Sequence, residues 1–267
     1  MNVEVKLYSI SEVSELTGVN AVTLRAWQRR YGLLVPQRTP KGHRLYTDND
    51  IAKIHDILAW LDKGVSIGKV KPLLDGAVEH QQSDVEKIEL VDDTLSFIEQ
   101  GKLSQVEKRL REAVKLYPFK MLEEQFLQPI ELYISRTENP LRALHMSIWS
   151  TVVVQCFVSI FTKVNVEKNT PCLVMSYSSM NNHHVWQQAL KLAYDGYYVI
   201  VLCDISGKLT GLSSLLQDKQ INAMYIVGEN KLDNKQLAEI ENVMSECDIA
   251  CEFIGSIRNI HQGEIVV

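Results

Sequence analysis

The stretch that decides the fold runs from Val22 to Leu34 and reads VTLRAWQRRYGLL. Leu24, Trp27 and Tyr31 recur at helical spacing, which places them on one face of a helix. The arginines fall between these apolar positions and lie around the opposite face. The stretch therefore predicts a helix with one buried side and one cationic side that can reach phosphates and base edges.

A shorter helix is predicted just before this one. Ser9 and Glu12 form a capping box, because each side chain can accept a hydrogen bond from the main-chain amide of the other. Gly18 permits a sharp turn, since glycine adopts the left-handed conformation without strain, and Asn20 caps the following helix. The apolar stripe of the first helix consists of Ile10, Val13 and Leu16. The pattern is typical of a helix-turn-helix.

The segment from Gly32 to Tyr46 is rich in proline and glycine and predicts two short strands joined by a turn at residues 40–42. Its positive charges and hydrogen-bond donors are Arg38, Lys41, His43 and Arg44. Two more helices should follow, one opened by Thr47 to Asp50 and a short one from Ser66 to Leu74.

The motif at 22–34, with PQRT at 36–39 and GHRLY at 42–46, resembles the winged helix of the MerR family. The resemblance implies a homodimer that sets two second helices in successive major grooves of double-stranded promoter DNA and presses its wings on the flanking backbone, so that the operator is a palindrome. It also implies action on RNA polymerase at the promoter, either by distorting the DNA or by blocking it.

Two groups of DNA-contacting residues are expected from this arrangement. On the second helix they are Asn20, Thr23, Arg25, Arg29 and Arg30, and on the wing they are Arg38, His43, Arg44 and Tyr46.

Composition and charge limit the class of protein. Residues 1–76 carry 11 Lys and Arg against 8 Asp and Glu, a net of +3, which leaves −8 for the remainder of a chain whose net charge is −5. Only residues 1–76 therefore have the positive charge that favours binding to a polyanion. The longest apolar stretch, near Val152 to Phe161, is shorter than the roughly 20 residues of a membrane helix. We therefore expect a cytoplasmic protein with no membrane segment.

The five cysteines are scattered and contain no C-x-x-C pair, which indicates reduced thiols in a cytoplasm. Cys247 and Cys251 stand four residues apart and could meet on a helix, but no histidine or third cysteine lies nearby, so a structural role is favoured over a metal or redox role.

The expected fold is multi-domain. An all-α winged helix-turn-helix occupies residues 1–76, a linker 77–84, a four-helix bundle 85–168 and an α/β Rossmann-like domain 169–267. In the last domain, apolar runs beginning at Cys172, Tyr197, Ala223 and Ile249 alternate with helical stretches, which predicts a parallel sheet with helices on both faces. Ligands of such sheets sit at the carboxyl ends of the strands, here Tyr177 to His184, Asp204 to Gly207 and Gly228 to Asn230.

This layout resembles regulators whose sensor half descends from cobalamin-binding modules. The family holds the cofactor with the histidine of Asp-x-His-x-x-Gly, but here Asn181 stands at the histidine position and His184 at the glycine position. His183 is the other candidate for the motif histidine, but Trp186 then stands at the glycine position. On the bundle, the candidate ligand is His145, and it is preceded by Leu144 where the family has a glutamate. We expect no cofactor and no metal; a cobalamin-dependent light or vitamin sensor that represses transcription, with His183 or His145 as ligand, is the alternative.

The lost cofactor motif and the length are similar to regulators of the MlrA/BluR type within the MerR family. That similarity implies control of biofilm or surface-behaviour genes and a protein partner linked to cyclic di-GMP signalling. An enzyme is not expected, because the residues after Met175, Ser176 to Ser179, lack the glycines of a phosphate loop and no nucleophile and base stand at a recognisable spacing.

Overall fold

The computed structural model describes residues 6–76, 89–136, 138, 140–178, 182–205 and 209–262. The chain divides into two compact units, Met1–Trp149 and Ser150–Val267. This division differs from the three expected domains, because it groups the winged helix with the helices that follow it. The expected linker at 77–84 lies outside the described residues.

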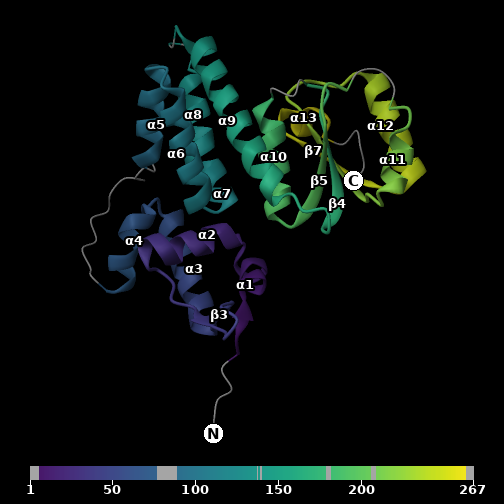
Figure 1. The fold of residues 1–267 in the computed structure, drawn as a ribbon. Helices are drawn as coiled ribbons and strands as arrows, with labels where there is room; N and C mark the ends of the chain where they lie inside the picture. The colour runs from purple at the N-terminus through teal and green to yellow at the C-terminus, as the bar shows by residue number, and fades with distance from the viewer. Residues whose placement is uncertain are drawn as a thin grey trace. The chain divides into compact units, whose positions relative to one another are not determined.

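The first unit begins with the expected helix-turn-helix and hairpin (Figure 1). Its elements are β1 (Tyr8–Ser9), α1 (Ile10–Thr17), α2 (Ala21–Ala26), the π-helix η1 (Trp27–Tyr31), β2 (Gln37–Arg38), β3 (Arg44–Tyr46), α3 (Asp48–Asp62) and α4 (Ile67–Leu74). The hairpin is part of a three-stranded antiparallel sheet in the order β1-β3-β2. The sequence pattern does not indicate β1, because its two residues are too few to show alternation.

The start and turn signals act as expected. The Ser9 amide donates to Glu12 Oε2 at 2.6 Å, which lowers the pKa of the Glu12 carboxyl below its usual value, and the Glu12 amide donates to Ser9 Oγ at 3.3 Å. Gly18 has φ of +68°, and Asn20 Oδ1 accepts from the amides of Val22 and Thr23, both at 2.9 Å. The turn and both helix starts are therefore confirmed.

The remaining helices of the first unit lie in the region predicted as a four-helix bundle, residues 85–168. They are α5 (Glu89–Glu99), α6 (Leu103–Leu116), a continuous run of α7 (Phe119–Leu122), η2 (Glu123–Leu127) and α8 (Gln128–Ile134), and α9 (Arg142–Val164). Helix α9 crosses the boundary between the units. Their packing as a four-helix bundle therefore stays a prediction.

Helix α9 is long and apolar enough to cross a membrane by length and composition, and among the described residues it alone meets that test. A helix of this length and apolar composition was not expected from the sequence. The same test is passed by core helices of soluble proteins. Several side chains of α9 are buried, namely Trp149, Val152, Val153, Cys156 and Phe157.

The second unit contains the expected parallel sheet. Its strands are β4 (Thr170–Met175), β5 (Tyr197–Leu202), β6 (Ala223–Val227) and β7 (Ala250–Ile254), in the order β5-β4-β6-β7. The helices are α10 (His183–Tyr194), α11 (Leu212–Asp218), α12 (Asn234–Cys247) and α13 (Ser256–Ile260). Figure 1 shows α10 on one side of the strands and α11 and α12 on the other. Leu173 and Met175 alternate with Cys172 and Val174 along β4 and all four are buried, because both faces of the sheet are covered.

One side chain joins the end of α9 to the edge strand β5. Asn165 Nδ2 donates to the Val199 carbonyl at 2.9 Å, and the Val199 amide donates to Asn165 Oδ1 at 2.7 Å. The amide group thus pairs with the main chain of β5 as a neighbouring strand would. It satisfies main-chain groups that this edge strand would otherwise leave to solvent.

Replacing this asparagine should destabilise the second unit. Asn165→Ala removes both hydrogen bonds, and the expected loss in free energy of unfolding is about 1–3 kcal/mol. Chemical denaturation followed by circular dichroism measures it. Asn222→Ala, at an exposed position before β6, serves as the control and should lose much less; equal losses would contradict the assigned role.

Candidate nucleic-acid interface

The outer face of the recognition helix, defined as α2 with η1, presents arginines to solvent. Arg29 and Arg30 are exposed and Arg25 is half-buried. Within the described part of the chain, no hydrogen bond or ion pair engages the guanidinium group of Arg25 or Arg29. Trp27 and Leu24 on the inner face are fully buried. The predicted division into a buried side and a cationic side is therefore what the structure has.

The buried side of the recognition helix is fixed by contacts inside the first unit. Trp27 Nε1 donates to the main-chain carbonyl of Leu116, the last residue of α6, at 2.8 Å. Gln125 Nε2 donates to the Leu61 carbonyl of α3 at 3.1 Å. The winged helix is thus attached to the helices that follow it by hydrogen bonds between segments distant in the sequence.

The wing is attached to the recognition helix by a side-chain contact. Arg44 Nε on β3 donates to Gln28 Oε1 at 2.7 Å. At the tip, Arg38 Nη1 donates to the Gly42 carbonyl at 3.4 Å, and Arg38 and His43 are exposed. Gln28 was not among the expected site residues; its place between the arginines, toward the hairpin, is the signal that could have identified it.

Two of the expected DNA-contacting residues are inside the unit. Thr23 and Tyr46 are 0% exposed, and their hydroxyl oxygens have no hydrogen-bond partner among the described residues. Burial also raises the pKa of Tyr46. Thr23 and Tyr46 are therefore not part of the exposed surface. Thr23 turns toward the core beside Leu24, and Tyr46 ends β3 where the strand meets the core.

Comparisons with known proteins agree with this geometry. Residues 8–77 match the family described as MerR HTH family regulatory protein. The chain is 32% identical over 197 residues to the HTH-type transcriptional regulator MlrA of Escherichia coli K12, covering 73% of this chain and 79% of that protein. It is 31% identical over 196 residues to MlrA of Salmonella typhimurium, with the same coverage. The chain belongs to the MerR family of transcriptional regulators and is of the MlrA type.

A further relative is similar to only part of this chain. The HTH-type transcriptional repressor CarH of Myxococcus xanthus is 41% identical over 80 residues, which is 30% of this chain and 27% of that protein. The similarity therefore does not extend over both units of this regulator.

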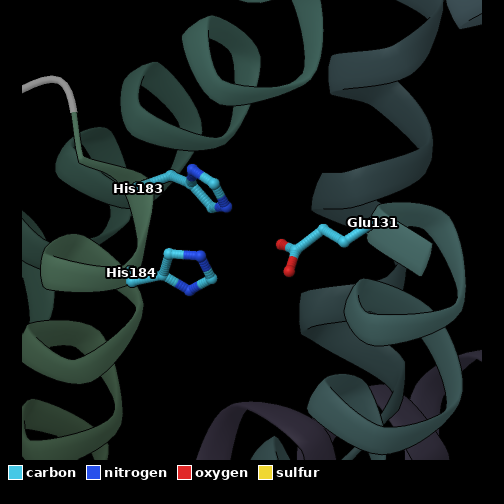
Figure 2. Close-up of side chains that lie close together, drawn as sticks. All are labelled: Glu131, His183 and His184. Carbon is cyan, nitrogen blue, oxygen red and sulfur yellow. The ribbon is translucent and has the colours of Figure 1, made fainter. Parts of the chain in front are cut away.

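The candidate histidines of the second unit stand at the start of α10, as Figure 2 shows. His183 is 7% exposed, its Nδ1 lies 3.1 Å from Ser150 Oγ, and its ring lies 4.1 Å from the ring of His184. Asn182 caps this helix by accepting from the His184 amide at 3.0 Å. Asn181 lies outside the described residues. His183 and His184 therefore form the start of a helix, and the His183 ring already lies beside Ser150 and His184.

These residues do not fit a cobalamin. Trp186 is buried and packs edge-on against Phe161 at 5.8 Å, so an indole occupies the position that the motif reserves for glycine. His145 on α9 is also buried, and its neighbour Leu144 is 55% exposed. At the strand ends, Tyr177 and Gly228 line a cavity of about 150 Å³, which is below the several hundred Å³ of ordinary ligand sites.

The cysteines have the properties of structural thiols. Helix α12 ends at Cys247 and Cys251 lies on β7, so the two do not meet on one helix as considered above. Burial raises the pKa of Cys172 and Cys251 to about 12 and that of Cys203 to about 11. These three thiols stay protonated near neutral pH and are poor nucleophiles.

The burial of Thr23 and Tyr46 predicts how substitutions at these positions affect stability and DNA affinity. Thr23→Val and Tyr46→Phe each remove a buried hydroxyl that has no hydrogen-bond partner in the described part of the chain, so the free energy of unfolding should be unchanged or rise, by up to about 1–3 kcal/mol. DNA affinity should not change. Thermal unfolding and a gel shift measure the two quantities; loss of DNA binding by a stably folded variant would show that these hydroxyls reach the duplex.

Proposed function

We propose that the regulator binds palindromic promoter DNA as a homodimer, with one recognition helix in each of two successive major grooves and the wings on the flanking backbone. The observation that carries the proposal is the pair Arg25 and Arg29, which face outward without a carboxylate partner among the described residues. Arginine in this setting suits bidentate contact with guanine and contact with phosphate.

The other members of the surface take distinct roles in this proposal. Asn20 Oδ1 is used by the helix cap, so its amide N–H groups remain for a phosphate. Gln28 holds Arg44 through Nε, which leaves the terminal nitrogens of that guanidinium for the backbone. Arg38 and His43 at the exposed tip supply further phosphate contacts.

For the second unit we propose a sensor role without a cofactor. The poor fit of Trp186 to a cobalamin supports signalling through a protein partner, which the resemblance links to cyclic di-GMP and to biofilm or surface-behaviour genes. Action on RNA polymerase at the promoter and a cytoplasmic location complete the proposal. Their support is the relation to transcriptional regulators.

The DNA-reading role is tested by removing one arginine at a time. Duplexes that the wild-type chain enriches from a random library should contain an inverted repeat, because a two-fold dimer places two half-sites about one helical turn apart. On such a duplex, Arg25→Ala and Arg29→Ala should each weaken binding by about 1–3 kcal/mol, or roughly 5- to 150-fold, in a gel shift.

Arg142→Ala provides the matched control, because Arg142 is exposed at the start of α9, away from the recognition helix in sequence. It should leave affinity unchanged. Wild-type affinity in both Arg25→Ala and Arg29→Ala would refute the assigned surface, and enrichment of a single unrepeated site would refute the dimer.

A further inference from the structure

An open cavity of about 400 Å³ lies beside the end of the recognition helix, between Arg30 and one face of α6. Its charged lining consists of Arg30, Lys108, Arg111 and Lys115 against Glu107 and Glu112. The lining is therefore net positive by two charges, in a chain whose net charge is −5. A positive hollow of this kind attracts anions.

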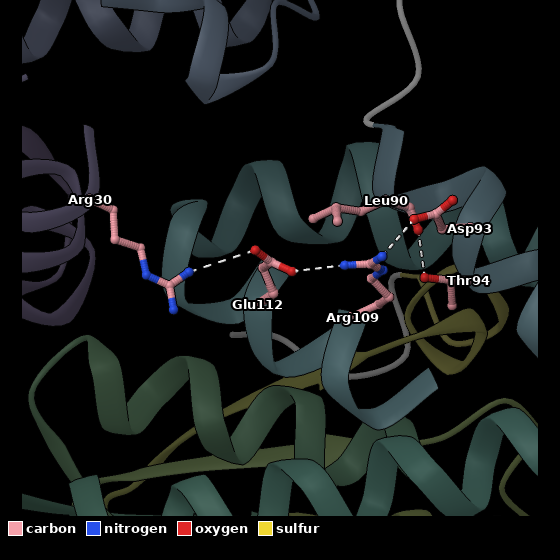
Figure 3. A network of polar contacts seen from close by, with 6 residues as sticks. All are labelled: Arg30, Leu90, Asp93, Thr94, Arg109 and Glu112. Atoms are coloured by element: carbon pink, nitrogen blue, oxygen red, sulfur yellow. Dashed lines mark hydrogen bonds and ion pairs between the residues drawn. The ribbon is translucent and has the colours of Figure 1, made fainter. Parts of the chain in front are cut away.

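Both carboxylates in the cavity are already paired. Glu107 Oε1 accepts from Arg111 Nε at 2.8 Å. Glu112 lies 3.6 Å from Arg30 Nη1 and 3.2 Å from Arg109 Nη1, and Arg109 also pairs with Asp93 at 2.9 Å (Figure 3). The pairing leaves the positive excess on the lysines.

Lys108 and Lys115 carry that excess. Both are exposed, and within the described residues neither has a hydrogen bond or ion pair. Lys108, Arg111 and Lys115 are spaced by three and four residues, so they form one stripe along α6. The stripe is about 10 Å long at 1.5 Å per residue, which is long enough to face more than one phosphate of a DNA strand.

The position of the stripe beside the recognition helix indicates its partner. Gln28, on one flank of the Arg25 and Arg29 face, holds the wing through Arg44. Arg30, on the other flank, pairs with α6 through Glu112. The arginines that face outward thus stand between the wing and the basic stripe, and the stripe continues the positive surface past Arg30.

We propose that Lys108, Arg111 and Lys115 of α6 bind the phosphate backbone of the duplex that the recognition helix reads, on the flank opposite the wing. The inference rests on the DNA binding proposed above and extends it to a helix outside the winged helix. Phosphate contacts of this kind add affinity and fix register without reading sequence.

The test compares the double variant Lys108→Gln/Lys115→Gln with the wild-type full chain in DNA-binding titrations over a range of salt concentrations. Each lost phosphate contact lowers the slope of log K against log salt by about 0.9, so the variant should lose about two units of slope. Affinity should fall by a similar factor on the selected operator and on an unrelated duplex of equal length, because phosphates are common to both. Circular dichroism confirms the fold.

Lys219→Gln is the control, since it removes the charge of an exposed lysine in the second unit; it should keep the wild-type slope. An unchanged slope in the double variant, or a loss equal to that of the control, overturns the proposal while DNA binding stands. Failure of the wild-type chain to bind any duplex overturns DNA binding and this inference together.

Discussion

The DNA-reading surface depends on the burial of Trp27. Its indole is fully buried, and its N–H donates to the last carbonyl of α6. A buried donor left without an acceptor costs about 1–3 kcal/mol, so this hydrogen bond limits how the recognition helix can rotate. With Trp27 inside, Arg25 and Arg29 have to face outward. Arg30 lies in the π-helical turn from Trp27 to Tyr31, and its guanidinium group pairs with Glu112 of α6.

Charge separation within the first unit complements this packing. Three carboxylates of the first unit are already engaged: Glu12 by its own helix cap, Glu107 by Arg111 and Glu112 by Arg30 and Arg109. A protein of net negative charge can therefore keep a local positive surface for a polyanion. Among the described residues, Arg30 is the arginine of the recognition helix that has a carboxylate neighbour. The pair is at 3.6 Å and Arg30 is half exposed, so it is a weak pair that water and phosphate can replace.

Local signals predicted much of this structure. The capping box at Ser9, the left-handed Gly18 and the Asn20 cap involve neighbours in sequence, and all three are present. The strand β6 begins at Ala223, as its apolar run predicts, because a strand buried on both faces of a sheet is apolar along its length. The cationic face of the recognition helix followed from helical spacing alone.

Long-range contacts could not be predicted in this way. Thr23 and Tyr46 belong to the expected DNA-contacting residues, but tertiary packing buries both side chains. The acceptor for Trp27 lies 89 residues away, and the partner of Asn165 lies 34 residues away. The basic stripe on α6 becomes a candidate only when Arg30 lies beside it. Such juxtapositions depend on tertiary packing, which periodicity does not encode.

Chemical modification of arginines, with and without duplex DNA, tests the central claim most directly. A dicarbonyl reagent that reacts with accessible guanidinium groups is applied to the full chain, and each site is quantified by mass spectrometry. Bound DNA should protect Arg25 and Arg29, while Arg258, 69% exposed in the second unit, should stay reactive. Equal reactivity of Arg25 and Arg29 in free and DNA-bound protein would contradict the account.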